Sequence, residues 1–331
     1  MHARRSLFRA FFAALVATAL SAFGAEAQIV RIAHHHAVGG IVDQAANRLA
    51  TTLRERSGGR INARVFPAAQ LGQEREAYDL LNSGAIDITF TSTGIMDKAY
   101  QPIEVTALPF VFRDWGHARR ALNGEFGQAM TDGLRANSNT EVLAYFGLGF
   151  RDMMFRGDPV PSLSGMTGVR MRSPESFVFI RMFELMGARP TPVTWGEVYM
   201  AMQTGVAAGL ESPAALALDM KFNEVTRSLV QTRHMFAIMA IDMNKQRFAR
   251  YSAAEQAMIR DAAREAGTWA EDTLAIPAEQ QAYDTLRQRG LQVVPAQDPE
   301  AWSRAMQPLL QEIRGRSADS GRLIDMLAAT P

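Results

Sequence analysis

Two arginines stand directly after apolar segments, where their side chains can bind an anion. Arg151 follows the apolar segment 142–150, and Arg172 follows the short segment 169–171 and precedes Ser173-Pro174. A guanidinium group matches the two oxygens of a carboxylate in a bidentate pair. In a domain of alternating strands and helices, ligands bind at the carboxyl ends of strands, where helix N-termini present free N–H groups. The two arginines therefore predict a carboxylate-binding site.

A third apolar segment, 206–210, ends at Glu211-Ser212-Pro213. Serine followed by proline is a typical helix start, because serine caps the helix and proline at the first helical position has no N–H group to leave unpaired. The same dipeptide follows Arg172. We therefore expect helix N-termini close to the arginines, and we count Ser212 among the candidate binding residues.

The motifs of common catalytic and metal sites are absent. The sequence has no glycine-rich phosphate loop, no G-x-S-x-G elbow, no H-E-x-x-H motif and no cysteine. Three consecutive histidines, His34, His35 and His36, would alternate between the two faces of a strand, so they cannot converge on one metal ion. The spacing marks no nucleophile–base pair. We predict a binding protein that is not an enzyme and uses no metal or cofactor.

The first 27 residues have the features of a secretory signal peptide. Arg4, Arg5 and Arg9 form a basic start, segment 11–20 is apolar but too short to cross a bilayer, and Ala25-Glu26-Ala27 matches a cleavage site. We predict cleavage after Ala27 and export to a bacterial periplasm by the general secretory route. The pair Arg4-Arg5 leaves the twin-arginine route open.

The charge of the chain is nearly balanced, with 35 basic and 34 acidic residues and a formal net charge of +1. It stays close to zero when the signal peptide, with three arginines and one glutamate, is removed. This gives no electrostatic reason to expect nucleic acid or anionic lipid as a partner. The roughly 300 mature residues are too many for a single core and predict two domains.

Strands and helices are predicted to alternate along the first part of the mature chain. Strands are expected at 29–33, 61–66 and 86–90, separated by helices that end at Gly58-Gly59 and at Gly84. The β-α-β-α-β order predicts a mostly parallel sheet with right-handed crossovers.

The rest of the chain continues the alternation. The expected elements are a strand ending at Arg151, a helix at 174–186, a strand at 190–193, a helix starting at the capping box Thr194–Glu197, a helix at 213–223, a strand at 236–241, a long helix at 252–288, a strand at 291–294, and helices at 299–314 and 319–328. The segment 236–241 would return the chain to the first domain, and the long helix would lie against both. We predict domain I at 28–150 plus 238–277, and domain II at 151–237 plus 278–331.

Six short motifs together resemble a known family. They are Phe66-Pro67 with Gln70-Leu71-Gly72, Gly84-Ala85-Ile86-Asp87, Leu108-Pro109-Phe110, Gly168-Val169-Arg170-Met171-Arg172, Gly196-Glu197-Val198-Tyr199 with Gln203-Thr204-Gly205, and Gly209-Leu210-Glu211-Ser212-Pro213. In this order and spacing, from about residue 29 to 320, the sequence resembles the periplasmic solute-binding proteins of TRAP transporters, the DctP-type family. The resemblance implies an α/β fold of two domains with a ligand cleft between them and a long helix spanning both.

The resemblance also implies roles for particular residues. Arg172 occupies the place of an arginine that forms a salt bridge with the ligand carboxylate, and Arg151 that of an assisting arginine. Trp195 corresponds to an aromatic residue that packs on the carbon skeleton of the ligand.

Further polar residues complete the predicted cleft. Ser212 stands where many relatives have asparagine, while Glu74 and Ser92 occupy positions that tend to line the cleft. His35 lies where relatives place a polar contact, and His234 is a further candidate.

We therefore predict a monomeric periplasmic protein that captures a small organic acid through Arg172 and delivers it to TRAP membrane permease subunits. Two other hypotheses stay open at this point, a periplasmic enzyme acting on a small acid and a ligand sensor that presents its bound form to a membrane receptor. Hydroxy, keto, sugar and aromatic acids and C4-dicarboxylates all remain candidate ligands.

Overall fold

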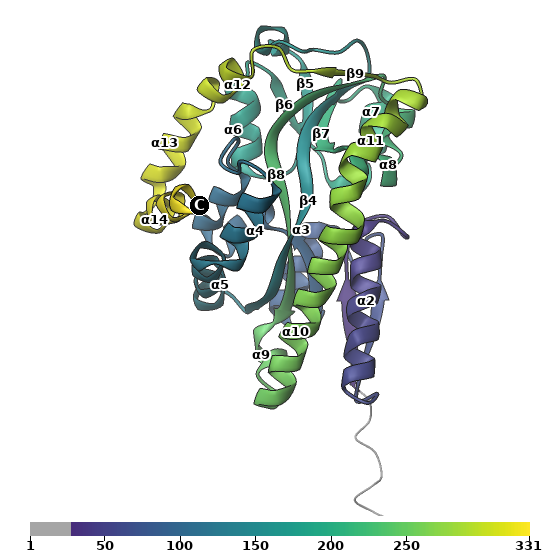
Figure 1. Ribbon diagram of the computed structural model, residues 1–331, viewed down its shortest axis with the longest axis vertical. Coiled ribbons are helices and arrows are strands. Elements are labelled where there is room, and N and C mark those ends of the chain that lie inside the picture. The colour runs from purple at the N-terminus through teal and green to yellow at the C-terminus, as the bar shows by residue number, and fades with distance from the viewer. Residues whose placement is uncertain (1–27) are drawn as a thin grey trace, which may run out of the picture.

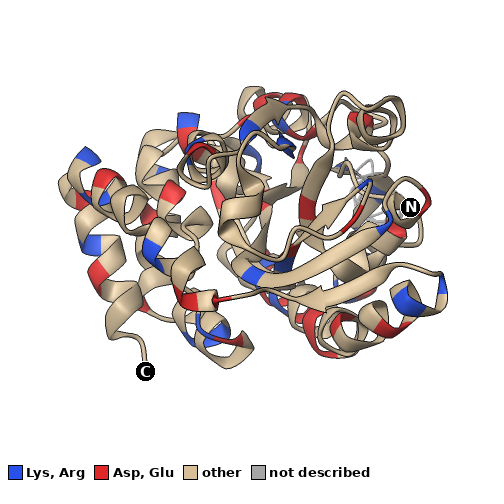
Figure 2. Ribbon diagram, turned by 90° about the horizontal axis from the view of Figure 1, so that it is seen from above, with Lys and Arg blue, Asp and Glu red and all other residues tan. Residues whose placement is uncertain are grey.

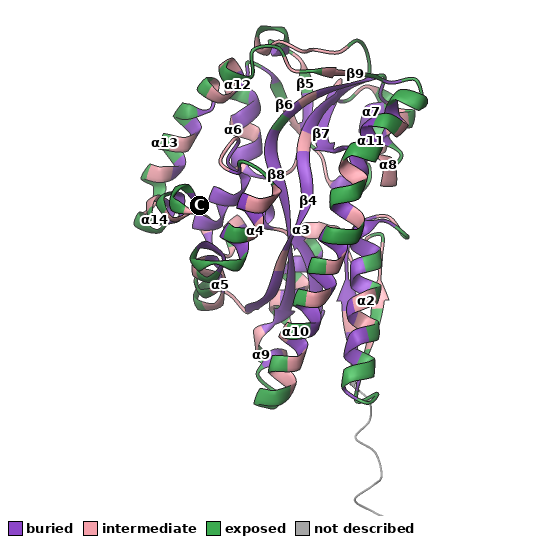
Figure 3. Cartoon of the chain, viewed as in Figure 1, coloured by how far each residue is buried: buried purple, intermediate pink, exposed green. Residues whose placement is uncertain are grey.

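Two long antiparallel strands, β4 (Thr140–Phe155) and β8 (Ser228–Asn244), run side by side through the middle of the molecule (Figure 1). The computed structural model describes residues 28–331, so the predicted signal peptide and its cleavage site lie outside the described residues. Both strands are buried along almost their whole length (Figure 3). The other strands extend the sheet outward from this pair.

The remaining strands form two parallel groups, one on each side of the central pair. Their bounds are β1 (Gln28–Ala33), β2 (Ile61–Phe66), β3 (Ile88–Ser92), β5 (Arg170–Ser173), β6 (Arg189–Pro192), β7 (Gly209–Pro213) and β9 (Gln292–Pro295). The order in the sheet is β2-β1-β3-β8-β4-β7-β5-β6, and β9 pairs with the first residues of β8. β3 joins the C-terminal part of β8 and β7 joins the C-terminal part of β4, so the two parallel groups lie toward opposite ends of the central pair.

Helices cover both faces of the sheet and enclose an apolar core on each face. On one face lie α2 (Ile41–Arg56), α7 (Val198–Thr204), α8 (Ala214–Asp219), α10 (Ala253–Ala270) and α11 (Ile276–Gln288). On the other lie α3 (Glu74–Ser83), α4 (Trp115–Asn123), α5 (Glu125–Asn137), α6 (Phe177–Leu185), α12 (Pro299–Ala305), α13 (Gln307–Arg316) and α14 (Ala318–Ala329). Basic and acidic residues are interspersed along the helices (Figure 2).

The side chains of β8 alternate between the two cores. Met239 and Ile241 pack in the core on the α10 side, whereas Phe236 and Ile238 pack in the core on the α6 side. A strand covered on both faces buries all of its side chains, which explains why the segment 236–241 is apolar without interruption.

A nearly continuous long helix follows the length of the sheet (Figure 1). It consists of α10, a π-helical turn at Glu271–Ala275, and α11. Pro277 lies in the first turn of α11, directly after the π turn. A proline has no N–H group and its ring crowds the preceding turn, and a π turn is one way for a helix to accommodate this. Of all the helices within residues 28–331, none is both long and apolar enough to span a membrane.

Two carboxylates attach the long helix to β4. Glu271 accepts a hydrogen bond from the backbone N–H of Gly147 at 3.0 Å, and Glu279 accepts one from that of Phe150 at 3.4 Å. The pairing of β4 with β8 shifts register between Gly147 and Gly149, and again after Arg151. A β-bulge takes N–H groups out of the ladder, and here the helix carboxylates bind two of them.

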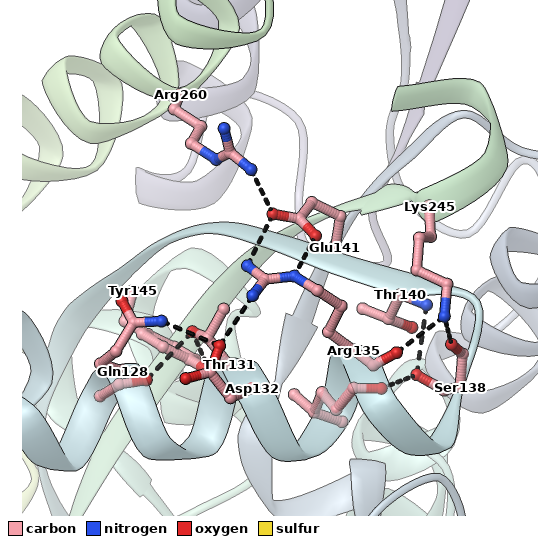
Figure 4. Close-up of polar contacts among 12 residues, drawn as sticks. Gln128, Thr131, Asp132, Arg135, Ser138, Thr140, Glu141, Tyr145, Lys245 and Arg260 are labelled. Carbon is pink, nitrogen blue, oxygen red and sulfur yellow. Dashed lines mark hydrogen bonds and ion pairs between the residues drawn. The ribbon is translucent and has the colours of Figure 1, made fainter. Parts of the chain in front are cut away.

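A third carboxylate fixes the beginning of β4 (Figure 4). Glu141 is buried and accepts hydrogen bonds from Arg135 of α5 at 2.7 and 2.9 Å and from Arg260 of α10 at 2.7 Å. Lys245 donates to the backbone carbonyl groups of Arg135 and Ser138. Helices from opposite faces of the sheet are thus tied to the same residue of β4.

Several predicted element boundaries were wrong. β4 does not end at Arg151 but continues to Phe155, because the following residues pair with β7 and are buried. Ser212-Pro213 closes β7 and does not cap a helix. Helix α6 begins three residues after Pro174. Thr194 makes no capping bond to the backbone, and its hydroxyl bonds the Glu197 side chain at 2.8 Å.

The predicted domain boundaries fall inside the two central strands. The boundary 150/151 lies within β4, and the boundary 237/238 lies within β8. Helix α13 contacts α6 and helix α14 contacts α5, so the C-terminal segment touches both predicted domains. The boundaries at which the chain was divided into domains I and II stay a prediction.

Asp152 connects β4, β8 and the long helix. Its carboxylate is fully buried and accepts hydrogen bonds from the Tyr283 hydroxyl at 2.6 Å and from the Arg233 backbone N–H at 2.9 Å. Burial raises the pKa of Asp152 to about 7, although both hydrogen bonds favour the ionised form.

This raised pKa predicts a pH-dependent stability. The unfolded carboxyl ionises near pH 4, so between about pH 4 and pH 7 the folded state binds more protons and stability falls as pH rises. Asp152→Asn lacks this ionisation. The difference in free energy of unfolding, Asp152→Asn minus native protein, should therefore increase by up to about 4 kcal/mol from pH 4 to pH 7.

Urea denaturation between pH 4.5 and pH 7.5 measures this difference. The exposed Asp261, which pairs with Arg264 on the same helix, supplies the control variant Asp261→Asn. A difference between Asp152→Asn and the native protein that stays constant with pH would contradict the raised pKa.

Candidate functional site

A cavity lies where the two parallel groups of strands meet the central pair. Its volume is about 640 Å³, including space open to solvent. Residues from both predicted domains line it, namely His35, His36, Glu74, Ser92, Thr93, Gly94, Ile95, Thr106, Ala107, Leu148, Arg151, Arg172, Pro174, Phe179, Trp195, Leu216, Met235, Phe236, Ala237 and Ile238. β4 and β8 contribute its floor, so the cavity is built on the strands that both halves share.

Arg172 is a buried cation whose charge no carboxylate of residues 28–331 neutralises through a salt bridge. Its side chain comes from β5, and the residue is 3% exposed. Nε donates to the Val193 carbonyl at 2.9 Å, and the guanidinium carbon lies 5.5 Å from the centre of the Trp195 ring. Burial lowers the pKa of Arg172 to about 10, so the group remains protonated at neutral pH. An anion in the cavity would compensate this desolvated charge.

Arg151 differs from Arg172 because it already has a carboxylate partner. Its Nη2 donates to Oε1 of Glu211 at 2.7 Å, its Nε pairs with Oε2, and Nη2 also donates to the Glu211 backbone carbonyl at 3.2 Å. Glu211 is fully buried on β7, which lies between β4 and β5 in the sheet. The structure thus places Arg151 in the cavity wall as one half of an ion pair.

Glu74, His35 and Ser92 are brought together at the edge of the cavity. One oxygen of Glu74 accepts from the Ser92 backbone N–H at 2.7 Å, and the other lies 3.6 Å from Nε2 of His35. Burial lowers the pKa of His35 to about 3, so its imidazole is neutral at physiological pH. This side of the cavity offers hydrogen-bonding groups and one carboxylate.

Trp195 lies between Arg172 and the apolar core. Its indole ring meets the edge of Phe222 with ring centroids 5.1 Å apart, and the residue is 8% exposed. The indole Nε1 is buried and has no hydrogen-bond partner within residues 28–331.

His36 is a cavity residue that the sequence did not single out. Its ring lies 4.2 Å from that of His35 and 5.9 Å from that of Trp195. The expectation that consecutive histidines alternate between two faces was wrong, because β1 ends at Ala33 and the histidines follow in a loop. Their position at a strand end was the available signal. His34 instead packs in the core and bonds Asp43 at 3.1 Å.

Ser212 and His234 lie behind the cavity wall, not in it. The Ser212 hydroxyl is fully buried and donates to the Pro213 carbonyl at 3.0 Å. His234 is also fully buried, with Nδ1 2.8 Å from the Thr232 hydroxyl and Nε2 3.8 Å from Glu211. The structure therefore provides no direct path from either side chain to a molecule in the cavity.

Among the described residues, the wall combines Arg172, which has no salt-bridge partner, with the Glu74 carboxylate, neutral polar groups and apolar surface. Leu148, Phe179, Leu216 and Phe236 supply the apolar part. Throughout the described chain, no group of three or more histidines and acidic residues is arranged to hold a metal ion. The arrangement suits a small anion that has a carbon skeleton and polar substituents.

Comparisons with known proteins agree with this geometry. The family model DctP, described as "Bacterial extracellular solute-binding protein, family 7", matches residues 32–316. The sialic acid-binding periplasmic protein of Vibrio cholerae is 30% identical over 275 residues, covering 83% of this chain and 85% of that protein. The 2,3-diketo-L-gulonate-binding periplasmic protein of Escherichia coli is 27% identical and covers 92% of both chains.

Solved structures agree as well. A TRAP periplasmic solute-binding protein from Bradyrhizobium sp., in complex with D-galacturonate, has a TM-score of 0.87 and 27% identity, covering 92% of this chain and 100% of that one. The predicted two-domain binding-protein fold class and the resemblance on which it was based are thereby confirmed.

The Arg151–Glu211 pair should be essential for stability, since a buried charge left without its partner is costly. Glu211→Gln removes the charge with little change of shape and leaves Arg151 uncompensated. We expect a loss of about 3–5 kcal/mol in the free energy of unfolding without ligand.

Urea denaturation at pH 7 measures this loss. Glu265→Gln is the matched control, because Glu265 pairs with Arg48 and Arg56 at the surface and such pairs contribute at most about 1 kcal/mol. Equal effects of the two variants would show that the buried pair is not a structural requirement.

Proposed function

The chain belongs to the family described as bacterial extracellular solute-binding protein, family 7, and from this we propose that it is the periplasmic binding subunit of a TRAP transporter that captures a small organic acid. The observation that carries the proposal is Arg172, a buried cation in the cavity wall without a carboxylate partner among the described residues. The protein acts as a monomer, exported with cleavage after Ala27, and hands its ligand to the permease subunits.

A single carboxylate on the ligand fits the charges of the cavity. Arg151 is already neutralised by Glu211, so among the described residues that line the cavity only Arg172 is a cation without a salt-bridge partner. A second ligand carboxylate would find no free cation and would approach Glu74, at an electrostatic cost. These charges support a monocarboxylate over a C4-dicarboxylate.

Polar groups around the remaining wall support a hydroxylated acid. Glu74 and the neutral His35 offer acceptors for hydroxyl groups, while Trp195 and Phe179 offer apolar surface to a carbon skeleton. The relatives bind sialic acid, 2,3-diketo-L-gulonate and D-galacturonate, which are all acids with several further oxygens. We therefore propose a sugar acid as the ligand class.

The cavity histidines do not support an enzyme. Burial lowers the pKa of His35 to about 3 and that of His36 well below its usual value. A base of such low pKa is a poor general base at neutral pH. The proposed role is therefore capture and release without chemical change.

Arg172 provides the decisive test. Arg172→Ala should weaken binding of D-galacturonate by roughly 30- to several-thousand-fold, because truncation leaves a desolvated carboxylate unpaired at about 2–5 kcal/mol. Arg172→Lys should also weaken binding clearly, since an ammonium group lacks the bidentate geometry.

Titration calorimetry compares these variants with Arg170→Ala. Arg170 stands on the same strand but is exposed and bonds the backbone carbonyl groups of Gly205 and Val206. Melting curves without ligand check that each variant folds. Near-native affinity in Arg172→Ala would refute the proposed carboxylate site.

Contacts across the rim of the cavity support closure of two domains around the ligand. Asp219 at the end of α8 accepts a hydrogen bond at 3.2 Å from the Ile41 N–H at the N-terminus of α2. Arg75 of α3 donates to the Glu175 carbonyl at 2.9 Å. Gly196 lies so close to the side chain of Gln73 that an added Cβ would be 2.8 Å from its amide nitrogen.

Each rim contact joins residues assigned to different predicted domains. D-galacturonate should therefore reduce the radius of gyration in small-angle scattering. Asp219→Ala removes a carboxylate that binds the N-terminus of α2 across the two predicted domains. Ligand dissociation should therefore become roughly 2- to 30-fold faster, which corresponds to the usual stabilisation by such a carboxylate. Asp284→Ala on the exposed face of α11 is the control. An unchanged radius at saturating ligand would argue against closure.

A further inference from the structure

Two residues of the cavity wall each carry a buried polar atom that has no hydrogen-bond partner within residues 28–331. These atoms are the indole Nε1 of Trp195 and Nε2 of His36. Both residues are less than one tenth exposed, and both line the cavity. Their rings lie 5.9 Å apart between centroids and are tilted by 52°.

Such atoms are uncommon in folded proteins, because an unsatisfied buried donor or acceptor is destabilising. An indole N–H can only donate, so Trp195 needs an acceptor. Burial and the neighbouring His35 lower the pKa of His36 well below its usual value, so its imidazole is neutral. A neutral imidazole has one nitrogen that donates and one that accepts.

We propose that Trp195 and His36 form a hydroxyl-binding subsite that recognises one hydroxyl group of the bound acid. A hydroxyl oxygen accepts the hydrogen bond from the indole N–H, and the same group can donate to, or accept from, the imidazole. This proposal rests on the proposed function, because it concerns the acid that Arg172 holds.

The subsite lies next to the carboxylate position. The guanidinium carbon of Arg172 is 5.5 Å from the centre of the Trp195 ring. An acid bound to Arg172 therefore brings its nearest substituents to the indole. Trp195 then selects the ligand through its N–H group, beyond the packing of its ring on the carbon skeleton.

The two roles of Trp195 can be separated by Trp195→Phe, which keeps an aromatic ring but loses the N–H donor. D-galacturonate and D-glucuronate are titrated first, and the tighter ligand is compared with four analogues that each lack one ring hydroxyl. For the native protein, one analogue should bind roughly 5- to 100-fold more weakly than its parent acid because the buried groups stay unpaired.

Trp195→Phe should bind the parent acid roughly 5- to 100-fold more weakly than the native protein does. The analogue that lacks the recognised hydroxyl should bind to Trp195→Phe almost as well as it binds to the native protein. His36→Phe should show the same selective pattern, with the same analogue. If both variants lose the same affinity for the parent acid and for all four analogues, Trp195 and His36 contribute only packing, and the proposed subsite is refuted. If native protein binds neither uronate, the proposed sugar-acid function fails at the first step.

A measurement on the native protein covers the case in which a variant does not fold. The four tryptophans give four indole N–H signals in a ¹⁵N-labelled sample. The Trp195 signal should move on addition of the parent acid and move much less with the discriminating analogue. The signal of Trp302, whose indole N–H donates to the Gln297 carbonyl, should stay in place. Equal movement of the Trp195 signal with both acids would contradict a hydroxyl contact.

Discussion

The antiparallel pairing of β4 with β8 is the interaction on which the rest of the molecule depends. These two strands alone reach from one parallel group of the sheet to the other, and their side chains form the floor of the cavity. The register shifts at Gly147 and after Arg151 lie close to that floor. Two backbone N–H groups of β4 beside the bulges donate to Glu271 and Glu279 of the long helix. The long helix is therefore attached to a strand that forms part of the cavity wall.

The charge of the cavity is decided by the order of three neighbouring strands. β4, β7 and β5 carry Arg151, Glu211 and Arg172 side by side. Glu211 forms its salt bridge with Arg151, which leaves Arg172 as the buried cation without a partner in the described part of the chain. These two arginines and the glutamate together carry a single net positive charge, and the Glu74 carboxylate also lines the cavity. Because Glu211 already pairs with Arg151, a second anionic group on the ligand would be buried without a cationic partner, which is unfavourable in free energy.

The alternation of apolar segments and turn residues predicted the α/β class and marked Arg172 at the end of a short apolar segment, whereas the two-domain cleft was implied by the resemblance to the DctP-type family. The sequence did not predict that Glu211 neutralises Arg151, because the position of β7 between β4 and β5 is a non-local property. The Ser212 expectation relied on a helix start, yet the residue lies inside a buried strand where its hydroxyl bonds the backbone. His36 was missed because the three histidines were expected to alternate between two faces, whereas they follow the end of β1 in a loop.

The polar groups of the cavity also bear on how affinity and stability are related. Arg172, the Trp195 N–H and His36 Nε2 are held buried by the packing of both cores, at a free-energy cost that those cores offset. A ligand that pairs with them removes this cost, and since these side chains are already packed, binding requires little side-chain ordering beyond the proposed domain closure. A site of this kind discriminates more strongly through its hydrogen bonds than through its apolar area, because a mismatched ligand leaves buried groups unpaired. Selectivity among acids of similar size should therefore reside in the few polar atoms that the fold leaves unsatisfied.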